Sequence, residues 1–267
     1  MEKVFEWRKS SISYVEFGTG SELLIAFHGF RQEAEIFLQF QEALREKYRV
    51  VAVDLPHQGE TIWREERELS VDDLRNLISA FLKALGHEGK VSLMAYSLGG
   101  HYALGLTIVN PELVKRIYLI GADGVGSKRF MRFITHNILG NWLYRAFVHF
   151  PYPIFALLWI MRSTRLMKPH GARFFKSSIS TIELRKGLFL IWESAARMNF
   201  NRREAADAIR TYKVELKMLY GRFDNVISHR DAKRFARMVP GSDLMVVDQG
   251  HDLIRSKNQR CIAKLAG

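Results

Sequence analysis

Cysteine is nearly absent from this sequence of 267 residues, which contains only Cys261. A single cysteine excludes a disulfide framework and any metal site built from several cysteines. The N-terminus, MEKVFEWRKS, lacks the apolar core of a signal peptide, and no stretch approaches the roughly 18 apolar residues of a membrane-spanning helix. These absences predict a cytoplasmic protein.

Acidic residues are missing from one long segment. The chain carries 40 Lys and Arg residues against 28 Asp and Glu residues, a formal net charge of +12. Between Asp123 and Glu183 there is no acidic residue, and most of the excess charge lies there. The segment contains nine basic residues, Lys128, Arg129, Arg132, Arg145, Arg162, Arg165, Lys168, Arg173 and Lys176. Since protein surfaces usually mix both signs of charge, this predicts an inserted element with its own role.

The same segment is rich in aromatic residues, among them Phe130, Phe133, Trp142, Tyr144, Phe147, Phe150, Tyr152, Phe155, Trp159, Phe174 and Phe175. They indicate either a helical core packed over a sheet or an apolar acyl pocket with a face that touches anionic membrane. The segment has no nucleic-acid motif and is too apolar to track phosphates, so we expect no nucleic-acid partner. His136, His149 and His170 have no carboxylate nearby in sequence, and we expect no metal site.

Outside this segment, apolar runs of strand length alternate with helical patterns. The predicted strands are Val4–Arg8, Ile12–Phe17, Glu22–Phe27, Arg49–Val53, Val91–Ala95, Val114–Ile120, Val214–Tyr220 and Asp243–Val247. The predicted helices are Gln32–Glu46, Ser70–Leu85, Ser97–Val109, His229–Met238 and Asp252–Ala266. This alternation predicts a mostly parallel α/β sheet with helices on both faces, formed by residues 1–123 and 206–267 and interrupted by a helical segment, 124–205.

The run AYSLGG, residues 95–100, follows one predicted strand and begins the next helix. A serine on such a tight turn projects its hydroxyl above the sheet, where it can act as a nucleophile instead of only capping a helix. The turn requires small residues two positions before and after the serine, and Ala95 and Gly99 meet this requirement. Ser97 is therefore the predicted nucleophile.

A serine hydroxyl needs a base to take its proton. His251 follows the last predicted strand, and Asp224 follows the strand before it. The chain order Ser97, Asp224, His251 is the order of a triad on this kind of sheet, and the residues follow strand ends, where open parallel sheets place their sites. Asp123, at the end of the sixth predicted strand, is a rival for the acid.

An oxyanion hole needs two preorganised backbone N–H groups. Leu98 follows the predicted nucleophile, and Phe30 follows His28 and Gly29 after the third predicted strand, so their N–H groups are the candidates. We expect His28 and Tyr96 near the substrate, although His28 can instead shape the loop and Tyr96 can be a core residue.

These features resemble the α/β-hydrolase superfamily, and the resemblance covers nearly the whole chain. It rests on His28-Gly29-Phe30, the loop DLPHQGET at residues 54–61, the Ser97 turn, Asp224 and His251. The family loop often reads DLPGHGxS, and here His57 and Gln58 replace its Gly and His. The resemblance implies an eight-stranded core with a helical cap after the sixth strand, where residues 124–205 lie.

Sequence therefore predicts a serine hydrolase that cleaves an ester or related acyl bond of an apolar or amphiphilic small molecule, without a cofactor. Carbon–carbon bond hydrolysis, thioester hydrolysis and acyl transfer use the same triad and remain alternatives. A binding protein on a hydrolase fold is another, although such proteins usually lack a triad member. The basic cap is expected to favour anionic amphiphiles or an anionic membrane surface.

Overall fold

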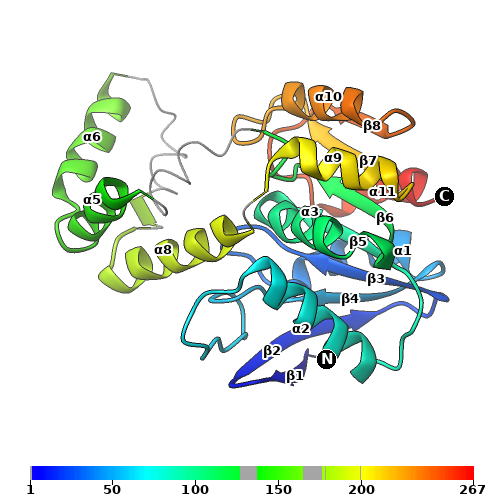
Figure 1. Ribbon diagram of the computed structural model, residues 1–267. Coiled ribbons are helices and arrows are strands. Elements are labelled where there is room, and N and C mark those ends of the chain that lie inside the picture. Colours follow the sequence, from blue (N-terminus) through cyan, green and yellow to red (C-terminus); the bar gives the residue numbers. More distant parts are fainter. Residues whose placement is uncertain (1, 127–136, 165–175, 178, 199) are drawn as a thin grey trace. The chain divides into compact units, whose positions relative to one another are not determined.

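The computed structural model contains an eight-stranded sheet and describes residues 2–126, 137–164, 176–177, 179–198 and 200–267 (Figure 1). The strand order is β1-β2-β4-β3-β5-β6-β7-β8. The strand β2 pairs antiparallel with both β1 and β4, and all the other neighbouring strands pair parallel. The strands are β1 (Glu2–Trp7), β2 (Ser10–Phe17), β3 (Glu22–Phe27), β4 (Tyr48–Val53), β5 (Val91–Tyr96), β6 (Val114–Ile120), β7 (Glu215–Gly221) and β8 (Asp243–Val247). The predicted mostly parallel α/β sheet is confirmed.

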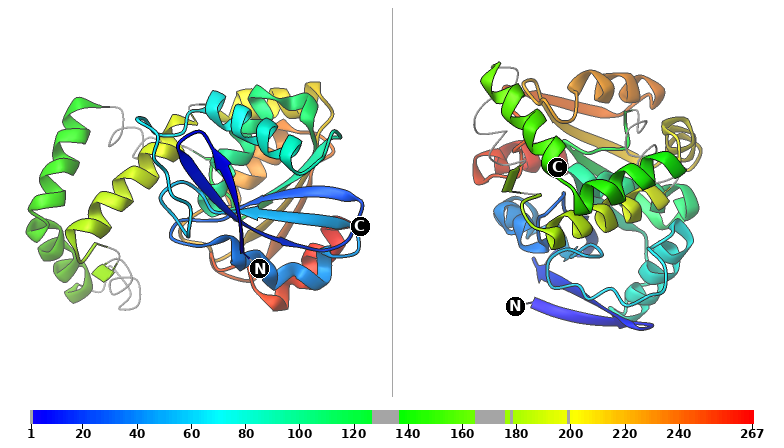
Figure 2. Two further views of the ribbon diagram at one scale, coloured as in Figure 1. Left: turned by 90° about the horizontal axis from the view of Figure 1, so that it is seen from below. Right: turned by 90° about the vertical axis from the view of Figure 1, so that its left-hand side faces the viewer.

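Helices cover both faces of this sheet, and its central strands β3, β5 and β6 are almost entirely buried. Every residue of β5, VSLMAY, is buried, as expected for a parallel strand with helices above and below. On one face lie α1 (Gln41–Leu44) and α11 (Gln259–Ala266), which pack against each other. The other face carries α2 (Val71–Ala84), α3 (Gly100–Val109), α9 (Arg202–Thr211) and α10 (His229–Met238). Figure 2 shows these two layers.

The start of α2 follows from its sequence. Ser70 accepts a hydrogen bond from the backbone N–H of Asp73, and the Asp73 carboxylate accepts one from the N–H of Ser70. This reciprocal capping satisfies two N–H groups that the first helical turn leaves unpaired. Leu74, Leu77, Ile78 and Phe81 then form the buried face of the helix.

The chain forms two compact units. The first comprises Met1–Ser127 and Arg197–Gly267 and contains the sheet; the second, Lys128–Ala196, is called the inserted unit below. The predicted insertion, 124–205, extends beyond the inserted unit at both ends. At its C-terminal end, α9 packs against α3 through the buried residues Ala205, Ala206 and Ile209, so this helix belongs with the sheet.

The described part of the inserted unit contains α5 (Ile138–His149), α6 (Tyr152–Ser163) and most of α8 (Ile182–Arg197). Tyr144 of α5 packs its ring on two aromatic rings of α8, Phe189 and Trp192. The buried Arg185 of α8 donates from Nε to the carbonyl of Val148 in α5 (2.7 Å), and Tyr144 donates to the Arg185 carbonyl (2.9 Å). These contacts fix α5 on α8.

Several residues considered in the sequence lie outside the described residues. They are Lys128, Arg129, Phe130, Arg132, Phe133, His136, Arg165, Lys168, His170, Arg173, Phe174 and Phe175.

Candidate active site

Ser97 occupies a strained turn between β5 and the 3-10 helix η2 (Ser97–Gly99) that leads into α3. Its φ of +48° lies in the left-handed region, which a residue with a side chain rarely adopts. Close packing explains the small neighbours: a Cβ atom on Gly99 would lie 2.1 Å from the carbonyl oxygen of Phe27, and Ala95 is fully buried. The predicted strand-to-helix turn is present, and its geometry requires glycine at position 99.

Ser97, His251 and Asp224 form a continuous chain of hydrogen bonds. Nε2 of His251 lies 2.8 Å from Oγ of Ser97, and Nδ1 of His251 lies 2.7 Å from Oδ2 of Asp224. The Asp224 side chain is fully buried, and its Oδ1 accepts hydrogen bonds from the backbone N–H groups of Val226 (2.7 Å) and Ile227 (2.9 Å). A carboxylate with these partners accepts the Nδ1 proton, which leaves Nε2 as an acceptor for the serine hydroxyl.

The loops after β7 and β8 bring Asp224 and His251 together. The N–H of Phe223 donates to the carbonyl of Gln249 at 2.9 Å, so the two loops are hydrogen-bonded just beside the site. A Cβ atom on Gly221 would lie 2.4 Å from that same carbonyl oxygen, so the approach needs glycine at the end of β7.

Tyr96 makes two further contacts with His251. Its hydroxyl donates to the carbonyl of His251 at 2.8 Å, and its ring is stacked on the imidazole with 5.4 Å between the centroids. Burial raises the pKa of Tyr96 to about 12, so the hydroxyl stays protonated and remains a donor at neutral pH. The sequence predicted a lining or core residue, and nothing in its pattern indicated this contact with the histidine.

The rival acid, Asp123, has a different partner. Its Oδ2 lies 2.8 Å from Nε2 of the fully buried His101, and its Oδ1 accepts from the N–H of Gly124. Its backbone N–H donates to the Ser97 carbonyl at 2.8 Å, which places Asp123 behind the serine turn. Of the two candidate acids, Asp224 is the one that is hydrogen-bonded to His251.

The loop that carries Phe30 lies directly beside Ser97. A Cβ atom on Gly29 would lie 3.0 Å from Cβ of Ser97, so glycine lets the loop approach the serine this closely. Phe30 follows Gly29 in this loop, and Leu98 follows Ser97 at the start of η2. Both candidate N–H groups therefore belong to backbone next to the serine.

Two glutamines to which the sequence assigned no role hold this loop. Oε1 of Gln32 accepts from the N–H of Gly29 at 3.0 Å, and Oε1 of Gln58 accepts from the N–H of Arg31 at 2.6 Å. The amides on both sides of Phe30 are thus fixed by side chains. Gln58 is almost fully buried, and it stands where the family loop commonly has histidine, which was the available signal for it.

His28 lies beneath the loop with both ring nitrogens engaged by backbone. Nδ1 lies 2.8 Å from the Gly29 carbonyl, and Nε2 accepts from the N–H of Leu55 at 3.0 Å. The ring is fully buried, with the Asp54 carboxylate 3.6 Å from Nε2. Burial lowers the pKa of His28, although the Gly29 carbonyl and Asp54 act in the opposite direction. These contacts support the loop-shaping interpretation.

The lowered pKa of His28 predicts acid sensitivity. The neutral ring is favoured in the folded state, so the unfolded chain takes up the proton first, below the ordinary histidine pKa of about 6.5. His28 therefore contributes its full stability above that pH, and the free energy of unfolding should fall by up to about 1.4 kcal/mol per pH unit below it. Urea unfolding across this range should show a shallower pH dependence in His28→Gln, which cannot be protonated; equal dependence would contradict the assignment.

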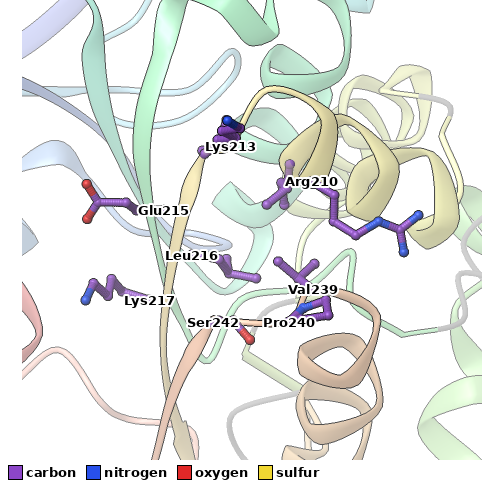
Figure 3. A pocket seen from close by; sticks show the side chains of 11 residues that line it. Arg210, Lys213, Glu215, Leu216, Lys217, Val239, Pro240 and Ser242 are labelled. Carbon is purple, nitrogen blue, oxygen red and sulfur yellow. The ribbon is translucent and has the colours of Figure 1, made fainter.

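A separate pocket lies at the other end of the sheet strands. It has a volume of about 440 Å³ and opens where β7 and β8 begin, between the end of α9 and the end of α10 (Figure 3). Ser97, Asp224 and His251 lie at the opposite, C-terminal ends of the strands. The pocket is lined by Ile209, Arg210, Lys213, Val214, Glu215, Leu216, Lys217, Val239, Pro240, Gly241 and Ser242, and it shares no residue with the hydrogen-bonded chain.

Known proteins match both the sequence and the fold. A 2-hydroxy-6-oxo-6-(2'-aminophenyl)hexa-2,4-dienoic acid hydrolase of Metapseudomonas resinovorans is 31% identical over 115 residues, 42% of this chain and 39% of that protein. A pimeloyl-[acyl-carrier protein] methyl ester esterase of Nitrosomonas europaea is 27% identical over 113 residues, 42% of each chain. The match thus spans less than half the length of these curated relatives.

The whole fold matches solved structures more completely. A thermophilic esterase from Thermogutta terrifontis superposes with a TM-score of 0.69 and 18% identity, covering 96% of this chain and 92% of that one. The Alpha/beta hydrolase family matches residues 23–263, which include every strand from β4 to β8 and the residues of the hydrogen-bonded chain. The protein therefore belongs to the alpha/beta hydrolase family.

Proposed function

We propose that this protein is a serine hydrolase that cleaves an ester or related acyl bond, with Ser97, His251 and Asp224 as its catalytic triad. The proposal rests on the hydrogen-bonded chain from Asp224 through His251 to Ser97. Each member follows the C-terminal end of a strand in one sheet, so the sheet brings the three to the same edge. Family membership supports hydrolysis as the reaction class.

The triad geometry defines the proton transfers. Oγ of Ser97 attacks the carbonyl carbon while its proton passes to Nε2 of His251, 2.8 Å away. Asp224 holds Nδ1–H and stabilises the imidazolium, which then gives its proton to the leaving group as the acyl–serine ester forms. Water attacks this ester, losing a proton to His251, and the proton returns to Ser97 when the acid departs.

The charge that develops on the carbonyl oxygen needs fixed donors. We assign these to the backbone N–H groups of Phe30 and Leu98. Gln32 and Gln58 hold the amides on both sides of Phe30, so its N–H is positioned before substrate arrives. Such preorganised donors act on the transition state without a cost of reorganisation during the reaction.

We infer that the substrates are amphiphilic acyl esters. Support comes from the segment 124–182, which lacks acidic residues and is rich in aromatic ones. With a panel of p-nitrophenyl esters of increasing acyl length, kcat/KM should rise from acetyl to medium and long chains, because each buried CH₂ contributes about 0.8 kcal/mol. A maximum on acetyl esters, with no activity on longer chains, would contradict this substrate class.

A second candidate is hydrolysis of a 2-hydroxy-6-oxo dienoic acid. The similarity to the M. resinovorans hydrolase favours it, and the same triad could serve it. Including such an acid in the assay separates the two candidates, because the ester hydrolase should leave it intact at concentrations where the esters are consumed.

A further inference from the structure

The helix α6 is apolar around its circumference and yet lies exposed. Its sequence, YPIFALLWIMRS, has charge or strong polarity only at its end, and Leu158 is its one buried residue. Helices without a polar face are normally buried in a protein core or in a membrane. Something outside the described contacts must therefore cover α6.

The exposed apolar residues continue onto α5. We call this set the apolar face; it consists of Ile138, Leu139, Trp142, Leu143, Phe150, Tyr152, Leu157, Trp159 and Ile160. On α5 the first four occupy the side opposite Tyr144 and Val148, which are buried. Ile138 is 90% exposed, and the two tryptophans are 63% and 69% exposed. Soluble monomers rarely display so many large apolar side chains in one region.

The surrounding charge indicates what covers this face. Arg145 of α5 and Arg162 of α6 are exposed, and neither helix contains an acidic residue. A second copy of the chain would place two basic, acid-free segments against each other, and like charges oppose such pairing. An anionic lipid surface matches both the basic charge and the apolar side chains, because it offers negative headgroups above an apolar interior.

The lengths of α5 and α6 indicate that these helices would lie in the membrane surface and not cross the bilayer. Each has 12 residues and is about 18 Å long, against about 30 Å for the hydrocarbon core of a bilayer. Among the described residues no single helix is long and apolar enough to cross a membrane, and α5 and α6 qualify only as a pair bent by 86°. Tryptophan and tyrosine, which the face displays, are enriched at the membrane–water interface.

We propose that α5 and α6 form a membrane-docking surface that inserts its apolar face into the headgroup region of an anionic bilayer. Trp142 and Trp159 enter the acyl boundary, while Arg145 and Arg162 contact lipid phosphates. This docking does not depend on the proposed hydrolase function, since it uses no residue of the triad.

Vesicle co-sedimentation of the full chain tests the proposal. At moderate salt the protein should bind phosphatidylcholine vesicles that contain phosphatidylserine, and bind pure phosphatidylcholine much more weakly. The double variant Arg145→Gln/Arg162→Gln should bind the anionic vesicles up to about 25-fold less, because each basic residue contributes up to about fivefold. Absence of binding to anionic vesicles, or equal binding to both kinds, overturns the proposal. The S97A variant is measured in parallel, so that lipid hydrolysis cannot alter the result.

A matched pair of isoleucines tests the location of the surface. Ile160 in α6 and Ile62 in the first unit are both 48% exposed. Ile160→Glu should weaken binding to anionic vesicles at least about tenfold, because a charge enters the apolar boundary, and Ile62→Glu should leave it unchanged. Equal effects of the two substitutions would overturn the assignment.

Two further measurements distinguish membrane docking from burial of the apolar face by the protein itself or by a second copy of the chain. In the absence of lipid, Ile160→Glu should melt at the wild-type temperature, and the wild type should sediment as a monomer. A marked fall in melting temperature would show that the protein itself buries Ile160. A wild-type dimer that Ile160→Glu dissociates would identify a second copy as the partner; either result overturns membrane docking.

Discussion

Replacing Ser97 by alanine should lower kcat/KM for an ester substrate by at least about 10⁴-fold while leaving the melting temperature nearly unchanged. The substitution removes the attacking oxygen, and His251 then has no proton to accept. A fluorophosphonate probe followed by intact-mass measurement checks the same point, because only an activated serine forms the covalent adduct. The wild type should gain one adduct per chain, and Ser97→Ala should gain none.

Ser92 provides the matched control for Ser97. It lies in the same strand, is 1% exposed, and its Oγ has no hydrogen-bond partner among the residues that the structure describes. Ser92→Ala removes an equivalent hydroxyl from β5 and should retain full activity and labelling. If the probe still labelled Ser97→Ala, another residue would be the nucleophile. If the wild type stayed unlabelled, a binding protein on this fold would be favoured.

Local sequence patterns were sufficient for the sheet and for the three residues at its strand ends. The strands β3, β4 and β5 are largely apolar runs, and a parallel sheet brings the residues that follow its strands to one edge. Ser97, Asp224 and His251 could therefore be expected near one another before their hydrogen bonds were known. Asp224 was preferred to its rival Asp123, but chain order alone does not separate them, because both lie between Ser97 and His251.

The contacts between loops could not be predicted in the same way. Gln58 accepts from the amide of Arg31, and both Arg31 and His57, the residue before Gln58, adopt left-handed backbone, with φ of +54° and +64°, although neither is glycine. No local pattern marks these conformations, since tertiary contacts impose them. The predicted segment, 124–205, differs from the inserted unit, Lys128–Ala196, for a related reason, because the pattern of α9 shows that one side of the helix is buried but not which unit buries it.

Replacing Asp224 by asparagine should lower kcat by about 10⁴-fold, the size of effect expected when a triad histidine is held in the wrong tautomer. Oδ1 of Asp224 accepts from the N–H groups of Val226 and Ile227, so the amide oxygen of an asparagine must take that position. Its NH₂ group then faces Nδ1 of His251 in place of Oδ2. Nδ1 becomes the acceptor, the proton moves to Nε2, and the histidine can no longer accept the proton of Ser97.

Asp123→Asn is the matched control, because Asp123 also pairs with a histidine beside the serine turn. Its partner is His101, which is fully buried, and the Asp123 backbone bonds to the Ser97 carbonyl without using the carboxylate. The control should therefore keep kcat within about tenfold of the wild type, an effect expected of a residue that acts on the turn and not on His251. Steady-state kinetics of both variants on one ester decide the question. A large loss in Asp123→Asn with a small loss in Asp224→Asn would make Asp123 the acid and would require His251 to change partner during catalysis.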